Sequence, residues 1–568
     1  MGHWVKRCLW YGHAVVSEAK KPSKVSAKSA RAGLGGLIRG FVKNPVVVSR
    51  VVASKMKSDP MRVAQAAAEA MPSKLRPVVG RIAWPVARYA RVTVRKIVRR
   101  MADGPLEEAK ALFEVGKMTE AVRVLEPHAR WPFIRRRITY YEGEIAAIGR
   151  DPIPVKEKVI VGERAPGRVL HLVTNALPYT QAGYTVRTHR IVTAQRALGL
   201  DPYVVTSWGW PMLQGHATAE PYAEIDKIPY HRMLPHGMDL PIESRGRMIR
   251  GASEVTELVR TLRPQVLHAA TDHRNGSVAL AVRERTGTPV VYEVRGFLEE
   301  TWTSRDPRRV GSERHLLQRE REATIMRSAD AVVTLAETMR TEIIERGVPR
   351  ERIFLAPNAV DDTLLTADYD GAAFRAQYGI EEHDIVVGSV SSIVGYEGFA
   401  TLLSAAAILR DAGTPIKVLI VGDGAERPAL LRQAEELGLD KDAILPGRVG
   451  PEEALQAQAA LDIFVCPRDD LKVTRLVTPL KPVEAMALGK PVVLSDLPAL
   501  AELVGGDGAG LLVRPESPEE LAKALAGLRD DPERRHLMGK AGKAEVAAHR
   551  TWSSLAKTYR EIYASITS

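Results

Sequence analysis

Short apolar runs alternate with amphipathic stretches along the chain from residue 168 onward. The series opens with the apolar run VLHLV at 169–173, a stretch of helical periodicity at about 185–198, and PYVVTS at 202–207. Strands that alternate with helical patterns predict a parallel sheet with helices packed on its faces. Further apolar runs of this first series lie at 265–270, 289–294, 331–336 and 352–357.

The same pattern restarts after Asn358. New apolar runs lie at 384–392, 417–424, 443–449, 463–467 and 490–496, with amphipathic stretches between them. The sequence therefore predicts two parallel α/β domains in tandem, over residues 165–365 and 366–550, followed by a C-terminal helix at 551–568.

Residues 105–164 have a different pattern, which predicts a helical hairpin followed by a linker. Gly116 marks the turn of the hairpin, and Ala121 and Leu125 lie on its second helix. The spacing faintly resembles one tetratricopeptide unit, although a stable array needs about three such units. We interpret the hairpin as a spacer, and the proline-rich stretch 151–167 as a linker.

Positive charge is concentrated at the beginning of the chain. Residues 1–104 contain 22 Lys and Arg against 4 Asp and Glu, whereas the whole chain has a net charge of +13. Asn44-Pro45 and Asp59-Pro60 are typical helix starts, and residues 86–101 repeat the basic amphipathic character. This extension is predicted to bind an anionic membrane surface. A solvated arm or a protein-docking face remains an alternative, and nucleic acid is not expected because no known binding motif occurs.

The composition excludes several classes of protein. Of 568 residues, 45% are hydrophobic and only two are cysteines, Cys8 and Cys466, which disfavours a disulfide-stapled secreted scaffold and a cysteine-rich zinc module. No run of 18 apolar residues suggests a spanning helix, and no apolar leader precedes Glu18. We expect a cytoplasmic protein that is peripheral to the inner face of the cell membrane.

The loops that follow the predicted strands are the places to search for chemistry, because ligands of open α/β sheets bind there. Gly422-Asp423-Gly424 directly follows the apolar run KVLIV and precedes a helical stretch. Glycines at this position let backbone amides approach a phosphate. A tight turn that merely requires small residues is the alternative.

The stretch TPLKPVEAMALGKPVVLSD at 478–496 resembles the donor-binding signature of family 4 glycosyltransferases, which have the GT-B fold of two Rossmann-like domains. ADAVVTLAETM, IFLAPNAVD and IVGDGAERPAL extend the resemblance over about residues 168–562. It implies that Glu484 accepts hydrogen bonds from the donor ribose, since a carboxylate can accept from two hydroxyls. Gly422, Gly424, Pro482 and Ala485 complete the predicted donor-binding segments.

The chain departs from the family pattern at charged positions. Many members have a second Glu eight residues before Glu484, where this chain has Leu476, and an Arg and a Lys where it has Ser392 and Glu397. A departing diphosphate still requires positive charge or oriented donors. Lys481 and Arg475 are the predicted replacements, with a surface salt bridge as the alternative for Arg475.

The first domain has a further substitution. Where members often have a His, this chain has Arg295 in PVVYEVRGFLEET, as in a subgroup that resembles bacterial exopolysaccharide transferases. Arginine cannot act as a general base, but its fork can hold a phosphate or an acidic sugar. The resemblance makes Arg295 and Lys481 the catalytic candidates. The predicted sugar or acceptor contacts are Gly183, Tyr184, Thr185 and Arg187 of the loop at 174–190, together with His268 after a later strand. An ordinary loop histidine is the alternative for His268.

The resemblance implies a transferase that moves a sugar from a UDP- or GDP-linked donor to a cell-envelope or capsular glycan, or to a lipid-linked acceptor. Retention of configuration follows from the resemblance alone. No cofactor and no metal are expected. Two alternatives are a non-catalytic GT-B scaffold and a nucleotide-sugar epimerase, and donor turnover separates the first of these from an enzyme.

Overall fold

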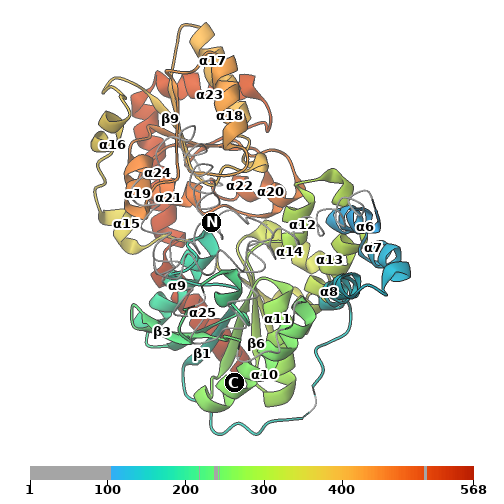
Figure 1. Ribbon diagram of the computed structural model, residues 1–568. Coiled ribbons are helices and arrows are strands. Elements are labelled where there is room, and N and C mark those ends of the chain that lie inside the picture. The colour runs from blue at the N-terminus through green and yellow to red at the C-terminus, as the bar shows by residue number, and fades with distance from the viewer. Residues whose placement is uncertain are drawn as a thin grey trace, which may run out of the picture.

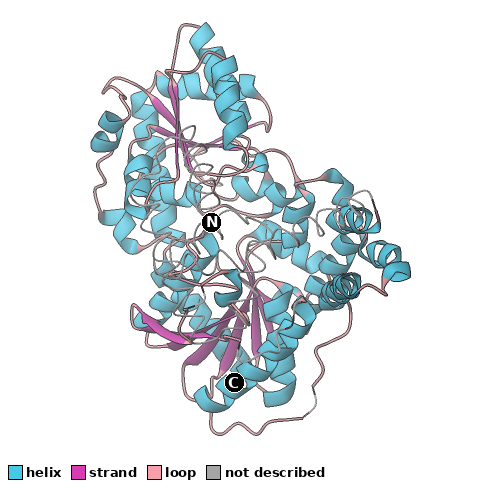
Figure 2. Ribbon diagram, viewed as in Figure 1, coloured by secondary structure: helices cyan, strands magenta, loops and turns pink. Residues whose placement is uncertain are grey.

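The computed structural model describes residues 104–155, 157–216, 218–235, 241, 243–504 and 508–567. Within them the predicted pair of parallel α/β domains is confirmed (Figures 1 and 2). The basic extension predicted at 1–104 lies outside this part of the chain except for Gly104. None of the helices described is both long and apolar enough to cross a bilayer.

The first domain is built on a sheet with strand order β3-β4-β2-β1-β5-β6-β7-β8. All neighbours pair in parallel except β3 with β4. The central strands are buried along their whole length, which explains why their sequences are mostly apolar. The strands are β1 (Arg168–Val173), β2 (Asp201–Thr206), β3 (Tyr222–Ile225), β4 (Ile228–Arg232), β5 (Val266–Ala270), β6 (Val290–Val294), β7 (Ala331–Thr334) and β8 (Ile353–Leu355).

Helices cover both faces of this sheet (Figure 1). They are α9 (Gly183–Ala197), α10 (Ser244–Leu262), α11 (His273–Thr286), α12 (Leu298–Thr303), α13 (Glu313–Ser328) and α14 (Glu337–Glu345). The strands β3 and β4 were not predicted, because YAEI and IPYHR are short and interrupted by polar residues, and β3 lies at the edge of the sheet.

The second domain has an all-parallel sheet with strand order β11-β10-β9-β12-β13-β14. Its strands are β9 (Val386–Val390), β10 (Lys417–Val421), β11 (Ala443–Gly447), β12 (Ile463–Cys466), β13 (Val492–Ser495) and β14 (Leu511–Val513). Its helices, with two connecting helices first, are α15 (Asp362–Thr366), α16 (Ala372–Gln377), α17 (Phe399–Asp411), α18 (Arg427–Glu436), α19 (Pro451–Ala459), α20 (Lys472–Leu476), α21 (Lys481–Ala487), α22 (Pro498–Ala501), α23 (Pro518–Arg529) and α24 (Pro532–His549).

The chain returns to the first domain at its C-terminal end. Helix α25 (Trp552–Thr567) packs Leu555 and Tyr559 against apolar residues of the first sheet, such as Val266 and Val291. The two segments that connect the domains, near residues 360 and 551, are hydrogen-bonded to each other. The Val360 N–H donates to the Arg550 carbonyl, and the Val360 carbonyl accepts from the Trp552 N–H. The C-terminal helix is thus a structural part of the first domain.

The region before the first sheet forms three helices, α6 (Pro105–Glu114), α7 (Met118–Leu125) and α8 (Pro132–Ile148). The turn at Gly116 agrees with the predicted hairpin, but α8 is an additional helix that the hairpin interpretation missed. The interpretation as a spacer is wrong, because α8 packs against α10 and α13 (Figure 1). The described residues of 149–155 and 157–167 then lead to β1 without a helix or strand.

Candidate active site

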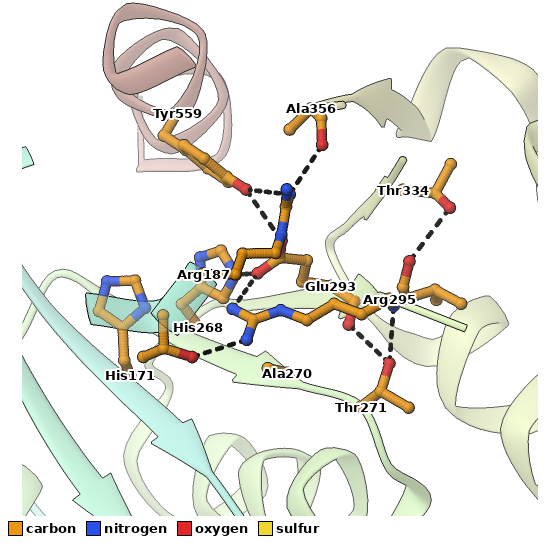
Figure 3. Close-up of polar contacts among 12 residues, drawn as sticks. His171, Arg187, His268, Ala270, Thr271, Glu293, Arg295, Thr334, Ala356 and Tyr559 are labelled. Carbon is orange, nitrogen blue, oxygen red and sulfur yellow. Dashed lines mark hydrogen bonds and ion pairs between the residues drawn. The ribbon is translucent and has the colours of Figure 1, made fainter. Parts of the chain in front are cut away.

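The centre of the first domain contains a buried carboxylate, Glu293 on β6, that is surrounded by donors (Figure 3). Arg187 of α9 donates from Nε and Nη2 to Glu293 Oε1 at 3.0 and 2.7 Å, and the Tyr559 hydroxyl of α25 donates to the same oxygen at 2.9 Å. Oε2 accepts from Arg295 Nη2 at 2.7 Å and lies 3.0 Å from Nε2 of His268. Residues of four elements, β5, β6, α9 and α25, therefore meet at one ion-pair network. Arg187 is buried within it and does not lie at an accessible sugar or acceptor loop as predicted.

The charges of this network decide the protonation state of Glu293. Burial by itself would raise the pKa of Glu293, but Arg295 and Arg187, with the hydrogen bond from His268, hold that pKa well below its usual range. Burial lowers the pKa of His268. The network therefore contains a carboxylate, two guanidinium groups and a neutral imidazole at neutral pH.

His268 does not lie where the sequence predicts it. It belongs to β5 itself and is fully buried, with Nδ1 2.7 Å from the Tyr563 hydroxyl of α25 and its ring stacked on His171. The assignment to a sugar-contacting loop is therefore wrong. The sequence around His268 does not reveal that its imidazole is buried and hydrogen-bonded to Glu293 and Tyr563, because both partners lie on other elements.

Arg295 follows β6 as predicted, and two of its three guanidinium nitrogens already donate hydrogen bonds within the protein. Besides Glu293 it binds Thr188 Oγ1 at 2.6 Å and the Tyr184 carbonyl at 3.0 Å, both from Nη1. Only 9% of its side chain is exposed, and its buried Nε has no partner in the described part of the chain. Arg295 thus ties the loop after β6 to the first turns of α9.

The predicted loop at the start of α9 is partly accessible. Gly183 begins the helix, and a Cβ at this position would have no other atom within 4 Å. Tyr184 is half exposed, and its hydroxyl lies 3.2 Å from Asn175 Nδ2. Thr185, in contrast, is buried and exchanges hydrogen bonds with the backbone of Ala182. Thr185 is therefore a capping residue. The prediction that its side chain contacts the sugar or acceptor is wrong, because that side chain is buried and bonded to Ala182.

The second domain brings Glu484 and Lys481 together on α21. Lys481 Nζ donates to Glu484 Oε2 at 2.7 Å, and both side chains are partly exposed. Pro482 and Ala485 are buried beneath them, so their side chains contribute to packing rather than to contacts with a donor. Arg475 binds Asp470 instead, which corresponds to the surface salt bridge of the alternative interpretation.

Gly422 and Gly424 have a structural explanation. A Cβ on Gly422 would lie 1.8 Å from the Ser391 carbonyl oxygen, and one on Gly424 would lie 1.9 Å from that of Ile393. The two loops that follow β9 and β10 are therefore in backbone contact. Both glycines are required for that contact, whether or not a phosphate binds there.

Sequence analysis missed Arg468, which follows β12. It donates from Nη2 and Nε to the two carboxylate oxygens of Glu397 at 2.6 and 3.2 Å, and from Nη1 to the Val477 carbonyl. Glu397, at the family's lysine position, is thus buried and neutralised by an arginine from another loop. A charged residue directly after an apolar strand was the signal that could have revealed Arg468.

The two domains are in direct contact near these loops. Asn358 accepts from Arg187 Nη1 at 3.2 Å and donates to the Thr478 carbonyl at 2.9 Å. Gly296, next to Arg295, lies opposite Val477. The network at Glu293 is therefore connected to the segment that precedes α21, although among the described residues no hydrogen bond or ion pair joins Arg295 directly to Lys481.

Comparison with known families accounts for this arrangement. Residues 182–359 match the glycosyl transferase 4-like domain, and residues 370–545 match the glycosyl transferases group 1 family. The chain belongs to the glycosyltransferases of the family 4 type. Strands β2 to β8 and the network residues Arg187, His268, Glu293 and Arg295 thus lie within the 4-like domain, and the α21 segment lies within the group 1 domain.

Relatives of this family member carry out several different transfers. It is 32% identical to a D-inositol 3-phosphate glycosyltransferase of Nocardia farcinica, over 43% of this chain and 54% of the relative. It is 29% identical to a 2-deoxystreptamine glucosyltransferase of Streptomyces kanamyceticus, over 40% of this chain and 56% of the relative. The chain spans about half the length of these curated relatives.

Solved structures show that the fold is GT-B. A sucrose-phosphate synthase from Thermosynechococcus elongatus superposes with a TM-score of 0.57 at 20% identity, over 70% of this chain and 100% of that chain. HepE of Anabaena in complex with UDP-glucose gives 0.55 at 19% identity, over 70% and 99%. These likenesses confirm the predicted fold class.

A second buried carboxyl group, Glu322 on α13, supplies a pH-dependent prediction. It accepts from the Tyr292 hydroxyl at 2.6 Å and from the His273 backbone N–H at 2.7 Å. Burial, with the nearby charges of Glu299 and Asp272, raises the pKa of Glu322 to about 8. The folded protein therefore holds this proton at a pH where the unfolded chain has lost it.

We expect the free energy of unfolding to fall as the pH rises from about 5 to 8, by on the order of 1 kcal/mol per pH unit from this group. The Glu322→Gln variant cannot titrate, so this fall should be absent in it. Thermal unfolding midpoints at several pH values, for the parent and for Glu322→Gln, measure the difference. Equal pH slopes in the two proteins would contradict the raised pKa.

Proposed function

We propose that this protein transfers a sugar from a nucleotide-sugar donor to an acceptor hydroxyl, with donor binding on the second domain. The observation that carries the proposal is the Glu484 and Lys481 pair on α21, inside the segment that matches the group 1 family. Glu484 would accept hydrogen bonds from the donor ribose. Lys481 would meet the negative charge that develops on the departing diphosphate.

Donor chemistry can be tested by direct binding. UDP-glucose is the first donor to test, because HepE of Anabaena has been solved with it, and a GDP-linked sugar is the second. Calorimetric titration of the full chain should give saturable binding of one of them. If no UDP- or GDP-linked sugar binds, the non-catalytic scaffold becomes the better interpretation.

We further propose that the acceptor is a cell-envelope or capsular glycan precursor or a lipid-linked sugar, and that transfer retains the anomeric configuration. Two features of the sequence support this proposal: the resemblance to exopolysaccharide-type transferases and the basic extension. Proton NMR of the product reports its anomeric configuration, and a product of inverted configuration would contradict retention.

The extension at 1–104 is proposed to hold the enzyme at the inner face of the cell membrane. Each Lys or Arg near an anionic surface contributes on the order of 1 kcal/mol, and such contributions are screened over about 10 Å at 0.1 M salt. The full chain should therefore cosediment with vesicles of anionic lipid and dissociate as salt is added. Removal of residues 1–104 should abolish cosedimentation without changing donor affinity.

A neutral vesicle is the matched control for this experiment. Equal binding to neutral and anionic vesicles, or binding that does not depend on salt, would contradict the electrostatic account. Retention of a protein or nucleic acid on the extension in the absence of vesicle binding would favour the docking alternative.

A further inference from the structure

The three helices α6, α7 and α8 lie outside both segments that match the family. They are nevertheless joined to the first domain by specific contacts. The Thr119 backbone N–H at the start of α7 donates to Glu313 at 2.7 Å, and the Gly116 carbonyl accepts from the backbone N–H of Arg314. This unit, residues 105–148, is therefore a fixed part of the first domain.

Helix α8 holds the beginning of α10 in place. Glu144 accepts from the Ser244 backbone N–H at 2.7 Å and from the Ser244 hydroxyl at 2.9 Å, and it lies 3.7 Å from Arg247 Nη2. A Cβ on Gly143 would lie 2.0 Å from Cγ of Glu243, so the two helices approach at a glycine. The first turn of α10 thus takes its position from α8.

That first turn forms one wall of a pocket of about 200 Å³. The pocket lies where β1 and β2 end and α11 begins, at the edge of the sheet where ligands of α/β domains bind. Its polar lining comes from the end of β2 and the loop after it, and from the first turns of α10 and α11. It includes Thr206, Ser207, Trp210, Ser244, Arg247 and Asn275.

The lining contains polar groups that lack partners. Thr206 Oγ1 and Trp210 Nε1 have no hydrogen-bond partner in the described part of the chain. Both residues are buried, Thr206 completely and Trp210 with 4% of its surface exposed. A buried polar group without a partner is costly, and a bound polar ligand would remove that cost. Asn275 is instead fixed by hydrogen bonds with Thr174 and Ser207.

The charge of the lining is one-sided. Two arginines, Arg247 and Arg274, line the pocket, and among the described residues no Asp or Glu does. Arg274 binds Asp272 and Arg247 lies near Glu144, but both guanidinium groups are partly exposed. Each presents five N–H donors, so donors remain for an anionic ligand.

We infer that the α6–α8 unit completes this pocket as a site for a single sugar ring that carries an anionic group, with Glu144 as a positioning residue for Ser244 and Arg247. The indole walls and the hydroxyl and amide groups suit a polyhydroxylated ring, and Arg247 suits its carboxylate or phosphate. The inference rests on the proposed function, since the ring would be the acceptor or its terminal sugar.

The probe for this site is glucuronate, compared with glucose as its neutral counterpart, and binding to the full chain is followed by saturation-transfer NMR. The parent should bind glucuronate more tightly than glucose. Arg247→Ala should weaken the binding of glucuronate at least about tenfold and leave the binding of glucose nearly unchanged. Glu144→Ala should reduce the same selectivity, whereas Glu144→Gln retains an oxygen for the Ser244 N–H and should keep part of it.

Glu142→Ala is the matched control, because Glu142 lies exposed on the same helix. It should change neither affinity. UDP-glucose titration of every variant separates the pocket from the donor site, and thermal midpoints report folding. Should Glu144→Ala fail to fold, Glu144→Gln and Arg247→Ala still decide the matter.

Unchanged glucuronate selectivity in both Arg247→Ala and Glu144→Gln would overturn the inference, as would a parent protein that binds no glucuronate. Binding of UDP-glucose without binding of glucuronate means that only this inference fails. Binding of glucuronate without binding of any nucleotide sugar would instead contradict the proposed function.

Discussion

Replacement of Glu293 with alanine is expected to destabilise the first domain by about 3 to 5 kcal/mol, because it leaves buried guanidinium groups without their carboxylate. Arg187 and Arg295 both bind Glu293, and Arg187 is itself 3% exposed. The Tyr559 hydroxyl would lose its acceptor as well, which weakens the attachment of α25. The thermal unfolding midpoint should fall by on the order of 10 °C.

Glu284→Ala is the control for this prediction, because Glu284 forms an exposed ion pair with Arg283 that should contribute about 0 to 1 kcal/mol. A Glu293→Ala midpoint within 2 °C of the control would show that the network does not hold the domain together. Since the pKa of Glu293 is lowered, the stabilisation is present at neutral pH and is lost as the pH falls through that depressed value.

Replacement of Glu484 with alanine is expected to weaken UDP-glucose binding by roughly ten- to a hundredfold, which corresponds to about 1.5 to 3 kcal/mol for hydrogen bonds to a charged acceptor. The change also frees Lys481, whose ammonium group now binds Glu484. The fold should persist, because the Glu484 side chain is partly exposed and the apolar residues beneath it are unchanged.

Calorimetric titration measures this effect, with Glu436→Ala as a control at an exposed position of α18. The control should bind UDP-glucose as the parent does. Equal affinities for Glu484→Ala and the control would remove Glu484 from the donor site, and would direct attention to Arg468 and the loops after β9 and β10.

The strands were predictable because strands buried on both faces are mostly apolar, as in IFVC of β12. The edge strand β3 was not, since it has little apolar sequence to distinguish it from a loop. Gly422 and Gly424 were found as a motif, but their packing against Ser391 and Ile393 is a long-range contact that spacing does not reveal.

The side-chain partners within the site were the least predictable part. Arg475 lies near Glu484 in sequence yet binds Asp470, whereas Arg468 reaches Glu397 across 71 positions. Thr185 resembled a ligand-binding residue but satisfies a helix terminus. Ion pairs between loops depend on how strands are ordered in the sheet, and that order is not encoded locally.

The packing of α8 could not be inferred for the same reason. Its contact with α10 depends on Gly143 and Glu144, which lie about 100 residues before Glu243 and Ser244. Neither residue belongs to a motif, and their pattern within α8 is that of an ordinary amphipathic helix. Only the folded arrangement connects them to the pocket at the end of β2.

The central claim is that the protein consumes a nucleotide sugar, and phosphorus NMR of UDP-glucose and a GDP-linked sugar tests it directly. The full chain is incubated with each donor and a membrane extract as the source of acceptor, beside Glu484→Ala. We expect the parent to convert one donor to its nucleoside diphosphate, and Glu484→Ala to do so far more slowly. Donor signals that persist unchanged with the parent, in the presence of the extract, would contradict it.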